Sequence, residues 1–341
     1  MTEARRLALD DPRWTAFVAT CPDAQPFHHP AWADLLADVY GYRAFAIAVE
    51  DAAGEIAAGL PMIEVAGVGG RRRWIALPFT DSCAPLVRRR DLDLAGALDE
   101  ARCRAGVTRL EVRADTAWPG AWQAAQASTH RLRLDPDPEV VFERFHRSQV
   151  QRGIRRAEHG GVVVRRGSST EDVAGTFYDL HVQTRRRQGV PVQPRAYFRR
   201  LAAVLERGLG FALLAYAGAT PVAGAVFLAW NGTVVYKYGA SDPAYWRLRP
   251  NHLIFWHAIR WACESGYRIL DFGRTDASNS GLRAFKQSWG AEEQPLVYVA
   301  LGNRTSDGAR HAGAGAIGAL IRRSPAWVCR LAGELLYRHA A

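Results

Sequence analysis

The pattern of apolar and polar residues predicts a series of strands and helices in the second half of the chain. The pair Asn231–Gly232 is the strongest two-residue hairpin signal present, because both residues tolerate the positive φ angles of a tight hairpin turn. Apolar runs on both sides of this pair predict two antiparallel strands. The strands predicted here are 210–217, 222–230, 233–239, 268–272 and 296–301, and the helices are 251–265 and 280–289.

The first half carries a looser pattern of the same kinds of element. Between residues 30 and 39, the apolar residues Trp32, Leu35, Leu36 and Val39 recur at helical spacing. The predicted helices are 11–20, 30–39 and 95–103, and the predicted strands are 44–49, 56–65, 71–79 and 109–113.

A boundary between the two halves is predicted at residues 135–138, Asp-Pro-Asp-Pro, because two prolines cannot continue a strand or a helix. After it come a basic helix over 142–156 and helices over 171–188 and 195–207, which precede the hairpin. The order of helices, hairpin, long helix, strand, helix and strand is that of an acetyltransferase-type (GNAT) domain. We therefore predict an α/β (α+β) chain of two tandem GNAT-like domains, 1–134 and 135–302, with mixed sheets flanked by helices.

Residues 303–341 are predicted to form a linker and an amphipathic helical tail. The linker is Gly/Ala-rich over 307–315, and Pro325 interrupts the helical pattern that follows. The apolar positions of the tail are Ile317, Leu320, Ile321, Trp327, Val328, Leu331, Leu335 and Leu336, and its basic positions are Arg322, Arg323, Arg330 and Arg338. The pattern leaves three interpretations open: a helix packed on the domain surface, an interfacial membrane helix, or a partner-binding helix.

Only two of the 44 basic residues are lysines, Lys237 and Lys286. Lysine changes its pKa readily when it is buried, whereas arginine stays charged. A lysine retained in such a composition is a candidate for a task that arginine cannot perform, with chance retention as the alternative. The net charge of +10 and the isoelectric point near 9.7 favour a polyanionic partner such as RNA, a phosphorylated cofactor or an anionic membrane. An arginine-rich surface without a partner is the other interpretation.

Several classes of protein are disfavoured by the sequence. Five scattered cysteines without ligand spacing argue against a zinc site and a disulfide framework. The N-terminal residues lack the apolar core of a secretory signal, and no apolar run reaches the length of a membrane span. We therefore expect a cytoplasmic protein without a metal, with the tail as a candidate contact to the inner face of the membrane.

The loop before the long predicted helix differs from that of an acyl-CoA enzyme of this fold. Such an enzyme needs a glycine-rich loop whose backbone N–H groups bind the pyrophosphate at a helix N-terminus. Here the residues 247–252 contain arginines but no glycine, and Pro250 removes one N–H donor. The sequence therefore gives weak support to a backbone site for coenzyme A.

Three motifs in the segment 240–299 resemble FemAB-type aminoacyltransferases. They are Arg249–Pro250–Asn251–His252–Leu253, Leu270–Asp271–Phe272–Gly273–Arg274 and Phe285–Lys286–Gln287–Ser288–Trp289–Gly290. Residues 147–164 resemble the basic helix at the start of the second domain of that family, and residues 77–81 resemble a looser form of a first-domain motif. The resemblance is nearest to the FemAB-like group associated with exopolysaccharide and exosortase gene systems.

This resemblance implies a twin GNAT fold that transfers an aminoacyl group from tRNA to an amine of a cell-wall precursor. It implies no metal, no tightly bound cofactor and no covalent enzyme intermediate. It also implies that Lys286 stabilises the carbonyl oxygen that becomes negative during attack, which agrees with the chemistry of ester aminolysis.

The remaining candidate residues have open alternatives. Asp271, at the end of a strand, is predicted to orient or deprotonate the attacking amine, or else to cap a turn. Lys237 lies either in the cleft or in a surface ion pair; alternation places it on the face opposite Tyr236 and Tyr238. The predicted substrate-binding residues are Arg274, Arg283, Lys237, Tyr238, Asn251, Phe79 and Asp81. The predicted RNA or phosphate contacts are Arg147, Arg152, Arg155, Arg247 and Arg249, for which a solvated surface is the alternative.

Three functions are compatible with the sequence. The first is an aminoacyltransferase that uses aminoacyl-tRNA and a cell-envelope or small-molecule amine. The second is an N-acyltransferase of the same fold that uses acyl-CoA in polysaccharide or natural-product assembly. The third is a non-catalytic RNA- or membrane-binding protein. The glycine-free loop favours the first over the second, and the Phe285–Lys286 motif disfavours the third.

Overall fold

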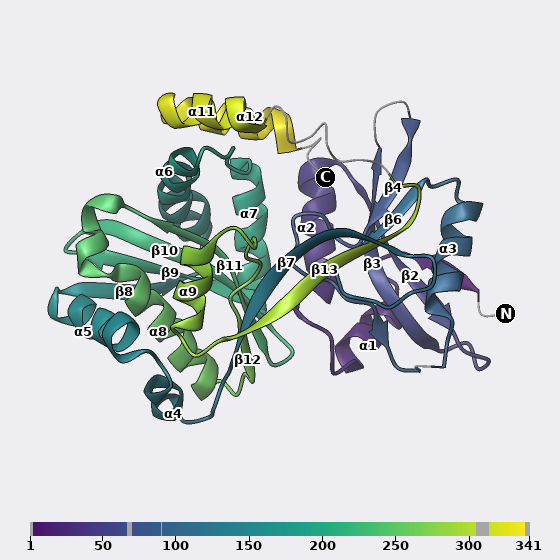
Figure 1. Cartoon of the computed structure of the whole chain (residues 1–341), viewed down its shortest axis with the longest axis horizontal. Coiled ribbons are helices and arrows are strands. Elements are labelled where there is room, and N and C mark those ends of the chain that lie inside the picture. Colours follow the sequence, from purple (N-terminus) through teal and green to yellow (C-terminus); the bar gives the residue numbers. More distant parts are fainter. Residues whose placement is uncertain (1–2, 67–69, 90, 305–313, 338–341) are drawn as a thin grey trace.

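One continuous mixed sheet runs through the molecule (Figure 1). The computed structural model describes residues 3–66, 70–89, 91–304 and 314–337. Its strands are β1 (Ala4–Leu7), β2 (Arg43–Glu50), β3 (Ile56–Ala66), β4 (Arg72–Ile75), β5 (Leu86–Val87), β6 (Arg109–Val112), β7 (Trp122–Arg133), β8 (Val162–Gly167), β9 (Gly210–Ala217), β10 (Thr220–Trp230), β11 (Thr233–Ser241), β12 (Ile269–Asp271) and β13 (Glu292–Gly302). Their spatial order is β1-β2-β3-β4-β6-β13-β7-β12-β11-β10-β9-β8, and β5 pairs with β3 outside this path. The predicted mixed sheets are confirmed, and the structure adds that the two halves share one sheet.

Two long strands, β7 and β13, join the halves. β7 belongs to the first half of the sequence, yet it pairs with β12 of the second half and with β13. β13 comes last in the sheet-forming sequence, yet it lies between β7 and β6 of the first half. The sequence pattern did not predict β7, although it is one of the longest strands.

Helices cover both faces of the sheet (Figure 1). They are α1 (Pro12–Thr20), α2 (Pro30–Tyr40), α3 (Leu94–Arg104), α4 (Pro138–Glu143), α5 (Arg152–His159), α6 (Tyr178–Gln188), α7 (Arg195–Val204), α8 (Pro250–Glu264), α9 (Ser280–Gln287), α11 (Ala314–Arg323) and α12 (Ala326–Leu336). Shorter helical turns are η1 (Pro26–His28), η3 (Arg147–Gln151), η4 (Glu171–Phe177), η5 (Leu205–Leu209) and η6 (Pro243–Leu248). The predicted boundary at 135–138 leads into α4, where the Asp137 side chain accepts a hydrogen bond from Glu139 N and so caps the helix.

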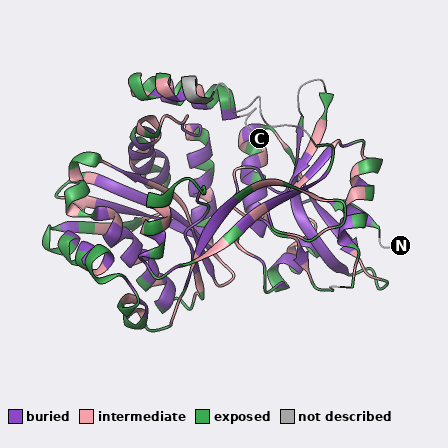
Figure 2. Cartoon of the chain, viewed as in Figure 1, coloured by how far each residue is buried: buried purple, intermediate pink, exposed green. Residues whose placement is uncertain are grey.

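The strands of the second half are apolar on both faces because helices cover both. Along β9, Phe211 and Leu213 contact the core under α5 and α8, whereas Ala212 and Leu214 contact the core under α6 and α7. Figure 2 shows the resulting buried strands. The core under α6 and α7 continues into the first half, where α2 packs against α7.

A β-bulge in β11 corrects one prediction. Phe227 pairs with Tyr236 and its neighbour Val226 pairs with Tyr238, so Lys237 is the extra residue on its strand. Because the bulge shifts the alternation, Tyr236 joins the core under α8 and Tyr238 packs against the core under α6 and α7. The prediction that these two tyrosines share one face was wrong.

The tail forms two helices, α11 and α12, which pack on α6. Residues 307–313 of the predicted linker lie outside the described residues, and 314–315 begin α11. Among the residues that the structure describes, no helix combines the length and apolar character needed to cross a bilayer.

Candidate active site

The candidate site lies at the seam of the two halves, where β11 and β12 separate. These strands run parallel over only three residue pairs, which end at Val235 and Asp271. Beyond that point the loop 77–83 of the first half approaches Gly273. A Cβ atom on Gly273 would lie 2.8 Å from Asp81 Oδ2, and the residue has a φ of +71°. Glycine is therefore required for this close approach.

Lys286 lies on α9 and is buried, with only 2% of its surface exposed. Its Nζ donates hydrogen bonds to Gly273 O at 2.7 Å and Arg274 O at 3.3 Å. An ammonium group has three N–H donors, so one remains for another acceptor. Burial lowers the pKa of Lys286 to about 8, although the charges of Asp81 and Asp271 raise it. The group is therefore mostly protonated at neutral pH and can act as a buried cationic donor.

The Lys237 side chain lies beside the same loop and is only 5% exposed, so the surface-pair alternative for this residue is wrong. Its Nζ donates to Phe79 O at 2.7 Å and lies 3.8 Å from Asp81 Oδ1. The rings of Phe27 and Trp32 lie 5.2 and 5.5 Å from this ammonium group, within the range of cation–π contact. Burial lowers the pKa of Lys237, and the charge of Asp81 opposes that shift.

The loop that carries Phe79 and Asp81 holds an unusual backbone conformation. Leu77 and Phe79 have φ angles of 58° and 59°, which are costly for side chains of this size. Besides the Lys237 bond, Arg113 Nη1 donates to Thr80 O at 2.7 Å and the Tyr298 hydroxyl donates to Asp81 O at 2.7 Å. These bonds fix the loop and thereby the position of the Asp81 carboxylate.

Asp271 is close to Lys286, but its oxygens are already engaged. Oδ1 accepts from Thr129 Oγ1 at 2.7 Å and from Gly273 N at 2.8 Å, and Oδ2 accepts from Arg131 Nε at 3.1 Å. These contacts are those of a carboxylate that closes a turn and supports the loop under Lys286. Its part in deprotonating an amine stays a prediction.

The arginines of this region also have partners. Arg283 donates from Nε and Nη2 to the two oxygens of Glu293, at 2.9 and 3.0 Å. The edge of the Arg283 guanidinium that could bind a substrate carboxylate or phosphate in bidentate fashion is therefore occupied. Arg274 donates to Asp276 at 2.6 Å and lies over the ring of Tyr298, with its side chain partly exposed. The side chains of Arg274 and Arg283 are similarly exposed, at 38% and 40%, and they differ in that Arg283 is held by both oxygens of its carboxylate partner.

Tyr238 and Asn251 lie in different surroundings. Tyr238 donates to Tyr197 OH at 3.0 Å within the aromatic cluster between α6 and α7, where burial raises its pKa. Asn251 lies in the first turn of α8 and lines a pocket of about 270 Å³. The other residues that line this pocket are Ser241, Trp246, Arg249, Pro250, His252 and Phe285. Phe285 precedes Lys286 on α9, but Lys286 itself does not line this pocket.

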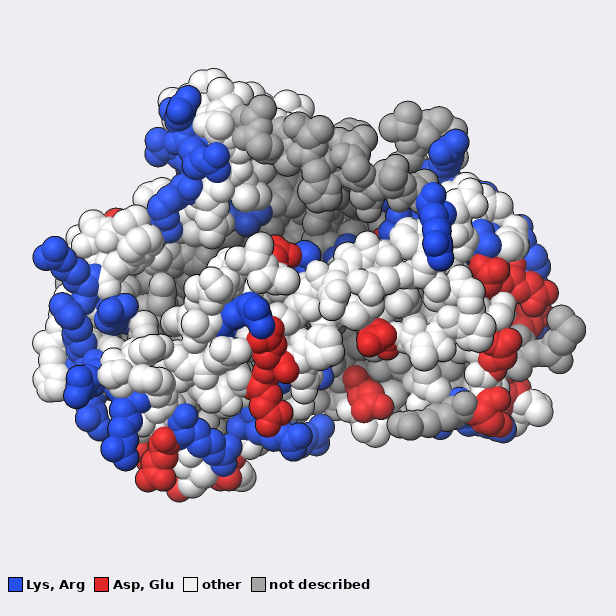
Figure 3. All heavy atoms as spheres, in the orientation of Figure 1, with Lys and Arg blue, Asp and Glu red and all other residues white. Residues whose placement is uncertain are grey.

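The five predicted RNA or phosphate contacts come from segments that touch one another. Arg147, Arg152 and Arg155 are exposed on η3 and α5, Arg247 is exposed on η6, and Arg249 is exposed as the N-cap of α8. Gly153 of α5 packs against the His252 ring, where a Cβ would lie 2.7 Å from Cδ2. The segments that carry these arginines are therefore in contact, and Figure 3 shows basic side chains over α5. Their contact with RNA or phosphate stays a prediction.

His130 on β7 is a buried residue that the sequence analysis missed. Its ring contacts no hydrogen-bond partner among the described residues, and its Nε2 lies 3.7 Å from Glu293 Oε2. Burial lowers the pKa of His130, and the charge of Lys286 lowers it further. Because β7 itself was not predicted as a strand, nothing in the sequence indicated that His130 would lie close enough to Lys286 to feel its charge.

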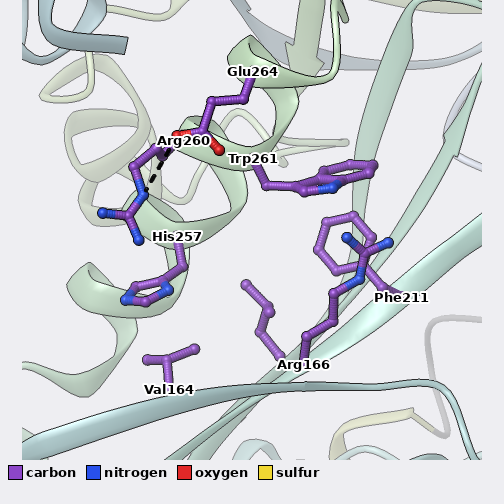
Figure 4. Close-up of a pocket in the computed structure, with 8 residues that line it drawn as sticks. Val164, Arg166, Phe211, His257, Arg260, Trp261 and Glu264 are labelled. Atoms are coloured by element: carbon purple, nitrogen blue, oxygen red, sulfur yellow. Dashed lines mark ion pairs between the residues drawn. The ribbon is translucent and has the colours of Figure 1, made fainter.

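A second hollow, of about 260 Å³, lies between β8, β9 and the last turns of α8 (Figure 4). The Arg166 guanidinium lies 4.2 Å from the ring centroid of Phe211 and 4.3 Å from that of Trp261. No predicted site residue lines this hollow. Across the described part of the chain, no three His, Cys, Asp or Glu side chains are grouped to hold a metal ion.

Comparison with known proteins identifies a domain family in the second half of the chain. The acetyltransferase (GNAT) domain family matches residues 144–287. The chain therefore carries an acyltransferase domain of the GNAT class, and the predicted fold class and enzyme class are confirmed.

One curated protein and two solved structures show more particular likenesses. A 75-residue segment is 35% identical to the lipid II:glycine glycyltransferase of Staphylococcus haemolyticus (strain JCSC1435); it covers 20% of this chain and 18% of that protein. The crystal structure of FemX matches with a TM-score of 0.70 at 16% identity, over 86% of this chain and 96% of FemX. A tandem GNAT protein from the clavulanic acid biosynthesis pathway matches with a TM-score of 0.53 at 14% identity, over 90% of this chain and all of that protein. These likenesses confirm the predicted FemAB-like GNAT fold.

Proposed function

We propose that this protein forms an amide bond by transferring an aminoacyl group to an amine of a cell-envelope precursor or a small metabolite. The observation that carries the proposal is the buried Lys286 ammonium at the seam of the two halves, with one N–H free. A buried charge lowers the stability of a fold, and such groups are concentrated in functional sites. The likeness to the lipid II:glycine glycyltransferase supports a cell-wall precursor as acceptor.

The chemistry follows from the groups at the seam. The lone pair of the acceptor nitrogen attacks the acyl carbonyl, a C–N bond forms, and negative charge develops on the carbonyl oxygen. The free N–H of Lys286 stabilises that charge. The ester C–O bond then breaks, and the proton released by the amine balances the proton taken up by the leaving hydroxyl group. Asp81, which is partly exposed beside both lysines, orients the incoming amine.

The favoured donor in this proposal is aminoacyl-tRNA. The exposed arginines of η3, α5, η6 and the α8 N-cap come from segments in contact with one another, which suits binding of a nucleic-acid backbone. The alternative donor is acyl-CoA, which the pocket of about 270 Å³ at the α8 N-terminus favours. In either case the reaction takes place on the cytoplasmic side, at or near the inner face of the membrane.

Two binding measurements on the full chain separate the donors. If aminoacyl-tRNA is the donor, its affinity will fall steeply with salt, and Arg152→Gln with Arg155→Gln will reduce the slope by about two. If acyl-CoA is the donor, it will raise the melting temperature in a saturable manner, and the arginine variants will have little effect. A protein that binds either ligand but shows no transfer to any amine would contradict the proposal and favour a non-catalytic binding protein.

Asp81→Asn is expected to move the alkaline limb of the kcat–pH profile to lower pH. The reaction needs protonated Lys286, so kcat falls as pH rises through its pKa, which is about 8. The Asp81 charge raises that pKa, and its removal lowers it. The variant should therefore lose more activity at pH 8 than at pH 6.5. The distant Asp99→Asn on α3 serves as the control, and an unmoved limb in Asp81→Asn would contradict the role of Lys286 as a charged donor.

A further inference from the structure

The two helices of the tail expose an apolar surface that their packing leaves uncovered. Six of the nine exposed large hydrophobic side chains among the described residues lie on α11 and α12. They are Ile317, Leu320, Trp327, Leu331, Leu335 and Leu336. Exposed apolar residues are common singly, but a concentration on one short segment marks a contact surface.

The outward face of α12 is opposite to the face that packs on the protein. Cys329, Gly333 and Tyr337 are four residues apart and buried, and Gly333 packs so closely on the Val192 backbone that no Cβ fits. The exposed residues Trp327, Leu331 and Leu335 are also four apart, displaced by two positions, and therefore lie on the other side of the helix. Their exposed fractions are 62%, 51% and 62%. The apolar stripe is thus not needed to hold the tail in place.

Basic residues accompany this apolar stripe. Arg323 is exposed at the end of α11, three positions from Leu320. Arg322 lies toward α6, where its Nη1 donates to Gln188 O at 3.5 Å, and Arg330 on α12 pairs with Asp179 at 3.1 Å. In Figure 1 the two helices lie end to end along the outside of the molecule, and Figure 3 shows basic side chains at the α11 end. A convex surface with leucines and a tryptophan, and with arginines beside them, has the chemistry of a helix that lies in a membrane interface.

We infer that α11 and α12 dock on an anionic lipid surface through Leu320, Trp327, Leu331 and Leu335, with Arg323 contacting lipid phosphates. The net charge of +10 adds long-range attraction to such a surface. A second copy of the chain fits less well, because a twofold contact through this face would place the same arginines on both sides of one interface. The docking inference depends only on the tail. The further idea that docking brings the enzyme to a lipid-borne acceptor rests on the proposed function.

Co-sedimentation of the full chain with vesicles tests this inference. We expect binding to vesicles of equal parts phosphatidylglycerol and phosphatidylcholine, and much weaker binding to phosphatidylcholine alone. The double variant Leu331→Glu with Leu335→Glu should lower the partition coefficient by more than about tenfold, because two apolar side chains no longer enter the interface. Arg323→Gln should lower the partition coefficient by about fivefold, on anionic vesicles only. Val163→Glu, at a 54% exposed position on β8, is the matched control and should bind normally.

Three outcomes would overturn the inference. They are binding that the Leu331 and Leu335 changes leave intact, equal binding to both kinds of vesicle, and a dimer in solution that the same changes dissociate. Failure of the proposed function is separable, because Lys286→Met should bind vesicles normally. Conversely, the tail variants should retain transfer to a water-soluble amine.

Discussion

Lys286→Met is expected to lower kcat by about 10²- to 10³-fold while KM changes by less than about threefold. The ammonium group acts on charge that develops only during attack, so its loss affects the transition state more than substrate binding. The measurement is steady-state transfer with the donor that the binding experiments identify. A variant that keeps kcat within about threefold would contradict the assigned role.

The same variant should remain folded, which separates a catalytic from a structural role. Burial brings the pKa of Lys286 from 10.5 to about 8, so holding its charge inside costs the fold about 3 kcal/mol. Methionine removes that cost, while the unpaired Gly273 carbonyl adds a penalty of about 1–3 kcal/mol. The free energy of unfolding should therefore change little. Ala284→Met, at an exposed position of α9, is the matched control and should keep both activity and stability.

Trp289→Ala is expected to lower the free energy of unfolding by about 3–5 kcal/mol. Trp289 is fully buried directly after α9, and its ring lies 5.0 Å from Phe145 and 5.4 Å from Phe255. Removing it leaves a large cavity between α9 and α8, and the aromatic packing that holds the Lys286 helix in place is lost. Urea unfolding measures the change.

Trp327→Ala supplies the comparison for this substitution. It removes the same side chain from an exposed position on α12 and should change stability by less than about 0.5 kcal/mol. If Trp289→Ala also cost less than about 1 kcal/mol, the aromatic cluster would not be what fixes α9 against α8.

The parts of the fold that the sequence predicted are those in which local chemistry decides the conformation. Asn231 and Gly232 adopt φ angles of 48° and 74°, as the hairpin prediction requires, and Trp230 pairs with Thr233 across the turn. The prolines at 136 and 138 did separate a strand from a helix. Lys286 was singled out because lysine is rare in this chain, and it lies buried where the two halves meet.

Other features depend on contacts between distant residues, and the sequence pattern did not contain them. β7 has the sequence WQAAQASTHRLR, whose alanines and glutamines have low strand propensity, so its pairing with β12 and β13 determines its structure. The bulge at Lys237 placed Tyr236 and Tyr238 on opposite faces of the sheet, whereas simple alternation predicted one shared face. Arg283 was predicted to bind substrate, but Glu293, ten residues away, occupies its guanidinium. Such contacts between residues distant in the sequence form only when the whole chain packs, so a local pattern cannot predict them.

The position of β13 has a consequence for the way this protein is made. β6 and β7 both pair with β13, so a nascent chain that has emerged only as far as α9 presents two unpaired strand edges. The first 134 residues therefore cannot complete their own sheet until the ribosome has released residue 302. Synthesis must keep those edges from aggregating until then, and a truncation before β13 would be expected to disable both lobes at once.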